Sequence, residues 1–245
     1  MATVEGRVSH APMTAEEKKV IFASSLGTVF EWYDFYLAGS LAIYISKTFF
    51  SGVNPTAGFI FTLLGFAAGF AVRPFGAIVF GRLGDMVGRN KYTFLVTIVI
   101  MGLSTFLIGF LPGYATIGIA APIIFIAMRL LQGLALGDEY GGAATYVAEH
   151  APSNKRGAWT AWIQTTATLG LFISLVVLLA VRTIVGKEQF SAWAWRIPFL
   201  VSILLLAVSV WIRMKLHESP VFERIKAEGK TSKAPLKEAF SKWKN

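Results

Sequence analysis

The sequence predicts an all-α membrane protein with six transmembrane helices, on the strength of three observations. Hydrophobic residues make up 55% of the 245 residues and charged residues only 15%, and the mean hydropathy is +0.59. This composition is too apolar for a soluble domain. Apolar stretches of about 20 residues, the length that crosses the hydrocarbon core of a bilayer, recur along the chain. Lysine and arginine concentrate in alternate connections between these stretches.

The six helices are expected at about 20–45, 57–80, 92–111, 116–147, 158–182 and 194–214. Turn-forming or polar residues separate them, namely the segments 51–55, 111–113 and 152–157 and the pair Lys187-Glu188. The chain therefore divides into a polar segment 1–19, a six-helix bundle 20–214 and a polar segment 215–245. The first segment does not resemble a cleavable signal, because the apolar stretch that follows it is too long.

The distribution of positive charge predicts the orientation. With the N-terminus inside, the segments assigned to the cytoplasm carry 17 lysines and arginines, against four on the opposite side. This asymmetry follows the positive-inside rule and holds for the short loops without the C-terminal tail. We therefore expect a multi-pass protein of the cell (plasma) membrane with both termini cytoplasmic. The net charge of +9 is then a topology signal, and nucleic-acid binding is a poor second interpretation.

The residue types present argue against an enzyme. The chain has no cysteine, which excludes disulfides, thiolate metal sites and cysteine nucleophiles. Its three histidines, His10, His150 and His217, lie outside the predicted spans, and no metal-binding or nucleophile spacing occurs. We expect no enzymatic activity, no cofactor and no metal.

The most specific local motif is the segment 81–91, Gly-Arg-Leu-Gly-Asp-Met-Val-Gly-Arg-Asn-Lys, between the second and third helices. Its glycines let two helix ends approach closely while the chain reverses. Asp85 can sit at the N-terminal end of the third helix or pair with a nearby arginine, and either role gives a cytoplasmic latch that can differ between two conformational states. The candidate gating residues are Gly81, Gly84, Asp85, Gly88 and Arg89. The simpler alternative is an ordinary charged turn.

This segment resembles the signature loop of the major facilitator superfamily, and residues 129–137 resemble its Arg-x-x-Gln-Gly-x-x-x-Gly element. Further motifs are Glu-Trp-Tyr-Asp-Phe at 31–35, Arg73-Pro74, Glu-Tyr-Gly-Gly at 139–142 and Glu-Ser-Pro at 218–220. Together they resemble the metabolite:proton symporter family, which implies transport of organic acids or zwitterionic osmolytes with protons. The resemblance covers essentially the whole chain, but only the N-terminal six-helix half of the family's twelve-helix pattern. Asp138 departs from it, because the family usually has glycine there.

Carboxylates within apolar spans are the strongest chemical signal. A charge at the membrane centre costs roughly 2.5–3.5 kcal/mol on translocon scales, so it needs a partner or a water-filled cavity. Glu31 and Asp34 are three residues apart on one helix face near mid-membrane, and Glu139 lies in the fourth span. Burial disfavours an ionised carboxylate and a nearby arginine favours it, so alternating exposure of such a group can carry a proton. We take Glu31, Asp34 and Glu139 as proton-coupling candidates. The alternative is a static ion pair that fixes helix packing.

Three further residues are candidates for substrate binding or charge pairing. Arg129 is a counter-charge for the acids or a docking point for an anionic substrate, because its guanidinium fork suits carboxylates. Gln132 lies some 60–80° around the helix from Arg129, so both can border one cavity. Arg73 lies on the face of Gly65 and Gly69, which permits close helix packing, so it should point into protein. It binds a substrate carboxylate or neutralises one of the acids.

The sequence thus predicts a secondary active transporter that couples protons to a small organic acid or zwitterion by alternating access. Its expected partners are the substrate, protons, the lipid bilayer, and a second six-helix half or another copy of itself. The alternative is a half-length fragment or partner subunit without transport activity alone.

Overall fold

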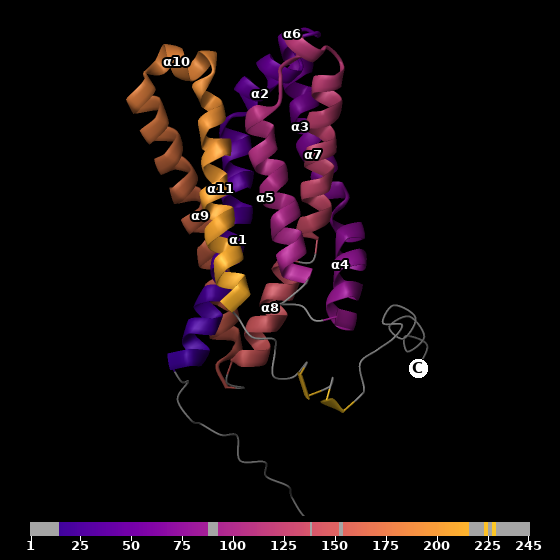
Figure 1. The fold of residues 1–245 in the computed structure, drawn as a ribbon, viewed down its shortest axis with the longest axis vertical. Coiled ribbons are helices and arrows are strands. Elements are labelled where there is room, and N and C mark those ends of the chain that lie inside the picture. Colours follow the sequence, from indigo (N-terminus) through magenta and orange to yellow (C-terminus); the bar gives the residue numbers. More distant parts are fainter. Residues whose placement is uncertain are drawn as a thin grey trace, which may run out of the picture.

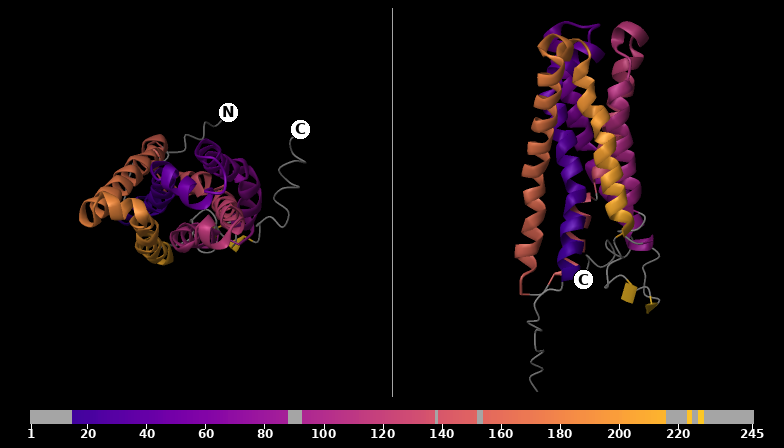
Figure 2. Two further views of the ribbon diagram at one scale, coloured as in Figure 1. Left: turned by 90° about the horizontal axis from the view of Figure 1, so that it is seen from above. Right: turned by 60° about the vertical axis from the view of Figure 1, so that its left-hand side comes forward.

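The computed structural model describes residues 15–87, 93–137, 139–151, 154–215, 223–224 and 227–228. In these ranges the protein is a bundle of long helices that run side by side along one axis (Figure 1). The views from above and from the side in Figure 2 show the same bundle end-on and rotated. α1 begins and α11 ends at the same end of the bundle, the lower end in Figure 1.

The helices form six consecutive rods. The first is α1 (Ala15–Ser40) continued by α2 (Ala42–Phe49), and the second is α3 (Pro55–Ala71) continued by α4 (Arg73–Val87). The third is α5 (Phe94–Phe110), and the fourth, after the short α6 (Tyr114–Ile117), is α7 (Ala120–Leu136) with α8 (Glu139–His150). The fifth is α9 (Arg156–Val185), and the sixth, after α10 (Lys187–Ala192) and a 3-10 turn (Ala194–Arg196), is α11 (Ile197–Lys215).

The predicted all-α class and the order of the six helices are confirmed. Among the described residues, four segments are long and apolar enough to cross a bilayer, namely Pro55–Gly84, Ala120–Glu149, Arg156–Val185 and Ala194–Ile212. α5 is a shorter apolar helix of 17 residues. α1 has 26 residues, which at 1.5 Å per residue is long enough to span the hydrocarbon, and it carries the buried acids.

Local sequence explains where several of these helices begin and end. The Asn54 side chain accepts a hydrogen bond of 2.9 Å from the amide of Ala57, and Pro55 occupies the first helical position of α3. Gly186 adopts φ +80° between α9 and α10, a backbone conformation that other residues rarely reach. At the end of α5, the Arg196 guanidinium donates to the carbonyl oxygens of Gly109 and Leu111, which have no partner within the helix.

One predicted boundary was wrong. We expected a loop over 81–91, but α4 continues through Val87. Gly81, Gly84 and Asp85 therefore lie in the last turns of α4, and Asp85 does not begin α5, which starts at Phe94 after Thr93. A glycine inside a helix costs only about 1 kcal/mol, which does not end a helix that packs against its neighbours. Gly88 and Arg89 lie outside the described residues.

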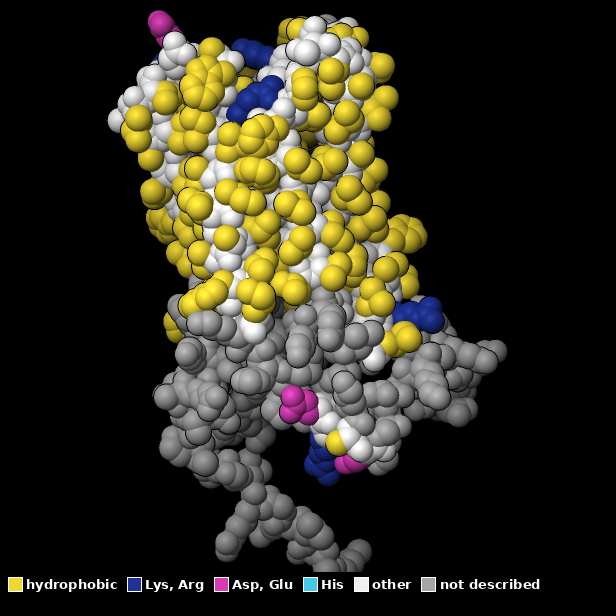
Figure 3. Space-filling view, viewed as in Figure 1, with side chains coloured by type: hydrophobic (Ala, Val, Ile, Leu, Met, Phe, Trp, Pro, Cys, Tyr) yellow, Lys and Arg dark blue, Asp and Glu magenta, His cyan; other side chains and the backbone are white. Residues whose placement is uncertain are grey.

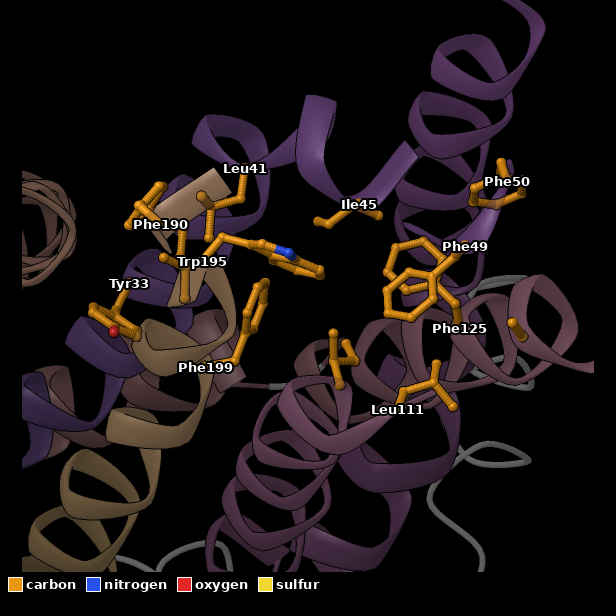
Figure 4. Packing of buried hydrophobic residues seen from close by; sticks show 13 residues of the cluster. Tyr33, Leu41, Ile45, Phe49, Phe50, Leu111, Phe125, Phe190, Trp195 and Phe199 are labelled. Atoms are coloured by element: carbon orange, nitrogen blue, oxygen red, sulfur yellow. The ribbon is translucent and has the colours of Figure 1, made fainter. Parts of the chain in front are cut away.

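The core of the described residues has two main clusters, and a smaller third cluster lies between α8 and α9. The larger, toward the upper end in Figure 1, is aromatic, and Figure 4 shows Phe49 against Phe125, and Phe199 beside Trp195. The ring centroids of Phe49 and Phe125 are 5.3 Å apart, and those of Trp195 and Phe199 are 6.2 Å apart. The second cluster joins α1, α5, α7 and α11 around buried residues such as Phe30. The Tyr33 hydroxyl also ties α1 to α11 by donating to the Pro198 carbonyl at 2.7 Å.

The outer surface is apolar along the length of the bundle. Figure 3 shows hydrophobic side chains covering the face in view, with the visible lysines and arginines toward the two ends. Phe75, Val176 and Leu204 are each more than 60% exposed. Such an exposed apolar surface is suited to lipid or to further protein in the membrane, not to water.

Candidate functional site

A cavity of about 510 Å³ is bordered by α1, α3, α4 and α7, and it gathers five of the candidate residues. These are Glu31, Asp34, Arg73, Arg129 and Gln132. Its remaining wall is largely apolar or aromatic and includes Phe35, Tyr36, Phe66 and Phe70. Convergent polar groups in an otherwise apolar cavity are typical of small-molecule binding sites.

Asp34 is the centre of a buried polar network. Its Oδ2 is 2.8 Å from Nη1 of Arg129, and its Oδ1 accepts a 2.9 Å hydrogen bond from the Thr105 hydroxyl. Gln132 Nε2 donates to Thr105 Oγ1 at 2.8 Å and lies 3.4 Å from Asp34 Oδ1. The side chains of Asp34 and Arg129 are only 5% and 6% exposed. Both charges are therefore compensated within a nearly closed pair.

Glu31 pairs with the second arginine in a looser contact. Its Oε1 is 3.3 Å from Nη1 of Arg73, longer than the 2.7–2.9 Å that is usual for such charge-assisted bonds. The Glu31 side chain is 6% exposed, but that of Arg73 is 30% exposed. The Arg73 guanidinium also lies 4.2 Å from the centre of the Phe70 ring, a cation–π contact.

Both ion pairs connect α1 to the helices on the opposite side of the cavity. The two acids come from α1, and the two arginines come from α4 and α7, which pack together through glycines. A Cβ atom on Gly133 of α7 would lie 1.9 Å from the Gly69 oxygen, and one on Gly137 would lie 2.2 Å from the Arg73 oxygen. Only glycine allows this backbone contact. This backbone contact fixes the positions of Arg73 and Arg129 along the bundle axis, opposite α1.

α1 is held on its other side by α9 in a similar way. A Cβ atom on Gly170 of α9 would lie 2.9 Å from the Val29 carbonyl oxygen and from the Tyr33 amide. The hydroxyls of Thr28 and Thr166 are also 2.5 Å apart across this contact. The carboxylates and the arginines thus belong to two closely packed helix pairs, joined across the cavity by the two ion pairs.

Several donors of Arg129 remain without a hydrogen-bond acceptor among the described residues. Its Nε and Nη2 atoms are buried and lack one, as does the Arg73 Nε. The Arg129 guanidinium carbon lies 5.0 Å from the centre of the Phe66 ring and 5.5 Å from that of Phe125. These ring faces offset part of the cost of burying the charge.

The structure brings five of the predicted site residues together at the cavity. Arg129 is the counter-charge of Asp34, Gln132 joins the same network, and Arg73 points into protein and neutralises Glu31. Glu139 begins α8, but its side chain lies outside the described residues, as do Gly88 and Arg89. The role of these residues in proton coupling or gating stays a prediction. Among the described residues, no group of three or more His, Cys, Asp or Glu is placed to hold a metal ion.

Sequence reasoning missed Thr105, Phe66 and Phe70. The Thr105 hydroxyl lies 3.0 Å from the Met101 carbonyl, the common contact of a threonine in any helix, so nothing in the sequence separates it from its neighbours. Phe66 and Phe70 are apolar residues in an apolar span. The only available signal was their spacing, because Phe66 lies seven residues and Phe70 three residues before Arg73, on one helix face.

Comparisons with known proteins show the family of the chain. The family described as sugar (and other) transporter matches residues 19–244. The chain is 41% identical over 235 residues to the inner membrane metabolite transport protein YhjE of Escherichia coli (strain K12), covering 96% of this chain and 53% of that protein. It is 42% identical over 207 residues to the proline/betaine transporter of Salmonella typhimurium, covering 84% of this chain and 41% of that protein.

A third relative is the shikimate transporter of Escherichia coli (strain K12), which is 39% identical over 208 residues and is matched over 47% of its length. Among solved structures, the xylose transporter XylE from E. coli in a partially occluded inward-open conformation superposes with a TM-score of 0.76. The identity there is 17%, with 89% of this chain and 52% of that chain covered, so the likeness shows the fold. The chain spans about half the length of the curated relatives it matches.

The sequence match over nearly the whole chain and the helical half-fold agree with one another. The protein belongs to the sugar (and other) transporter family, a family of membrane transporters and not of enzymes.

Proposed function

We propose that this chain forms the N-terminal half of a proton-coupled symporter for a small organic acid or zwitterionic metabolite, working by alternating access. The observation that carries the proposal is Asp34, a buried carboxylate that borders the cavity and is held by Arg129, Thr105 and Gln132. Relatives with names that include proline/betaine and shikimate transport support the substrate range.

Coupling follows from the charge balance of the Asp34–Arg129 pair. While Asp34 is ionised, the 2.8 Å contact holds α1 against α7. A proton on Asp34 removes the negative partner, and it leaves Arg129 to be compensated by another acceptor or by water. The protonated and ionised forms therefore favour different arrangements of α1 against α7. A proton that binds one arrangement more tightly than the other shifts the equilibrium between them.

Orientation and gating complete the proposal. Both termini are cytoplasmic, which places the lower end of the bundle in Figure 1 inside the cell. α4 ends at Val87 at that end of the bundle, and the candidate gating residues Gly81, Gly84, Asp85, Gly88 and Arg89 act on conformational switching. Glu139, which begins α8, is the next proton-coupling candidate after Asp34 and Glu31.

The test is transport in proteoliposomes with a panel of labelled organic acids and zwitterions, with and without a proton gradient. The chain is reconstituted with a second six-helix half that completes the transporter. Asp34→Asn is expected to abolish accumulation against the gradient while exchange of substrate survives, and Glu31→Gln is expected to have a similar or smaller effect. Glu188→Gln, at an exposed site in α10 away from the cavity, is the matched control. Accumulation by the Asp34→Asn, Glu31→Gln double variant places coupling elsewhere.

A second candidate is a partner subunit or fragment that transports nothing by itself. The observation that favours it is coverage, because the chain matches only 53% of YhjE and 47% of the shikimate transporter. The same assay, run on the chain alone and with a second half, distinguishes the two candidates. Gradient-driven uptake after a second half is added supports the first candidate, and no uptake under either condition supports a fragment without transport activity.

A further inference from the structure

We propose that the substrate carboxylate binds to one edge of the Arg129 guanidinium, and that it binds only after Asp34 has taken up the proton. This inference rests on the proposed symport function. It adds where the carboxylate binds and in which order the two ligands arrive. The proton binds first and releases Arg129 from Asp34, and the carboxylate then becomes the counter-charge of Arg129.

The Arg129 guanidinium uses only part of its hydrogen-bonding capacity. Its Nη1 atom lies 2.8 Å from Asp34 Oδ2, whereas its Nε and Nη2 atoms are buried and have no acceptor among the described residues. The N–H groups of Nε and Nη2 point to the same side of the planar guanidinium, an arrangement that binds both oxygens of a carboxylate. Arg129 also borders the cavity of about 510 Å³. This edge, formed by Nε and Nη2, is therefore a carboxylate site that Asp34 leaves unused.

Charge balance sets the order of binding. While Asp34 is ionised, its pair with Arg129 is neutral, so a carboxylate on the second edge would add an uncompensated negative charge beside the rings of Phe66 and Phe125. Protonation of Asp34 instead leaves Arg129 as an uncompensated buried cation. A carboxylate on Nε and Nη2 then restores neutrality. Proton and carboxylate therefore increase each other's affinity, and this effect is reciprocal.

The other charged groups around Asp34 leave this balance unchanged. Arg73 from α4 and Glu31 from α1 border the same cavity, and as an ion pair they add no net charge. The contact from α5 is the uncharged hydroxyl of Thr105. The other helices that pack against α1 carry charged residues only in their terminal turns, namely Lys47 in α2, Glu139 and Glu149 in α8, Arg156 and Arg182 in α9, and Arg213 and Lys215 in α11.

The experiment measures proton-linked binding of two carboxylates and of the matching primary amides. Shikimate is paired with its amide, and proline with prolinamide, so that each amide lacks only the carboxylate charge. Equilibrium binding and proton uptake are measured in lipid nanodiscs with the protein assembly of the transport assay and no proton gradient, over a pH range in which both carboxylates stay ionised. In the wild type, binding of at least one carboxylate is expected to take up about one proton. Its affinity should then rise about tenfold for each unit by which the pH falls, until Asp34 is protonated.

The variants identify the residues responsible. Asp34→Asn imitates the protonated state, so at a pH where Asp34 is ionised it is expected to bind the carboxylate about tenfold or more tightly than the wild type, without proton uptake. Arg129→Gln is expected to lose the preference for the carboxylate over its amide, and Arg129→Lys to retain part of it, because lysine keeps the charge but not the fork.

Two controls separate these effects from misfolding. Glu188→Gln and Arg182→Gln, both exposed and away from the cavity, are expected to match the wild type. The ratio of carboxylate to amide affinity within one sample is independent of the fraction of folded protein, so partial misfolding of an Arg129 variant does not affect the result.

A carboxylate affinity of the wild type that does not change with pH overturns the inference, as does the absence of carboxylate binding at every pH. An unchanged carboxylate preference in Arg129→Gln overturns it too, and so does pH dependence that persists in Asp34→Asn. Binding is measured without a gradient, so its failure is distinct from failure of symport. Proton-linked carboxylate binding together with gradient-independent uptake would refute the symport proposal alone.

Discussion

The contact between α3 and α7 through Gly69 and Gly133 provides the sharpest prediction about stability. Replacing Gly133 with alanine places a Cβ atom 1.9 Å from the Gly69 carbonyl oxygen and 2.7 Å from its carbon. Ordinary contacts begin near 3.4 Å, so the shortfall is about 1.5 Å. The obstructing atoms are backbone and cannot rotate away, so the two helices must move apart. Overpacking of this kind costs roughly 1–3 kcal/mol, and we expect the upper end of that range.

A matched variant isolates the steric cost. A Cβ atom on Gly141, which lies in α8, meets nothing within 4 Å. Both substitutions gain the helix propensity of alanine, about 1 kcal/mol, so their difference reports the clash. We expect Gly133→Ala to be about 3 kcal/mol less stable than Gly141→Ala in reversible unfolding in mixed detergent micelles. Equal stability of the two variants would refute the close contact between α3 and α7.

Three further predictions concern topology, gating and packing. Reporter fusions at Asn245 and near Pro112 should lie on opposite sides of the membrane, and the same side for both contradicts the six-helix topology. In the complete transporter, Asp85→Asn should slow transport while equilibrium substrate affinity stays largely intact, so a selective loss of binding by a folded variant argues against gating. Tyr33→Phe removes the 2.7 Å hydrogen bond to the Pro198 carbonyl and should lower the free energy of unfolding by about 1 kcal/mol. An unchanged unfolding free energy would show that this link between α1 and α11 contributes nothing to stability.

Much of the architecture was predictable because the bilayer constrains it strongly. Each span must satisfy its own backbone hydrogen bonds, so runs of about 20 apolar residues specify helices almost independently of their neighbours. The helix ends were less predictable. α4 continues through Gly81 and Gly84 to Val87, because the loss of helix stability at a glycine is too small to end a helix that packs against its neighbours.

The site was predictable in its composition but not in its pairing. The cost of a charge in hydrocarbon marks Glu31, Asp34, Arg73 and Arg129 from the sequence alone, because each needs a partner. Nothing in the sequence says which acid meets which arginine. Helical spacing puts both acids on one face of α1, and either arginine is a chemically suitable partner for either acid.

Only the packing of helices distant in sequence decided that pairing. Backbone contact at Gly69 and Gly133 sets the depth of Arg73 and Arg129, and it matches Arg73 with Glu31 and Arg129 with Asp34. The same packing brings Thr105 from α5 to Asp34 and leaves one pair closed and the other partly open. The sequence by itself determined the helices, their order and the charges that need partners, since these follow from local composition. The tertiary structure decided which charges meet and how exposed each pair is, since these depend on distances between helices that no local pattern encodes.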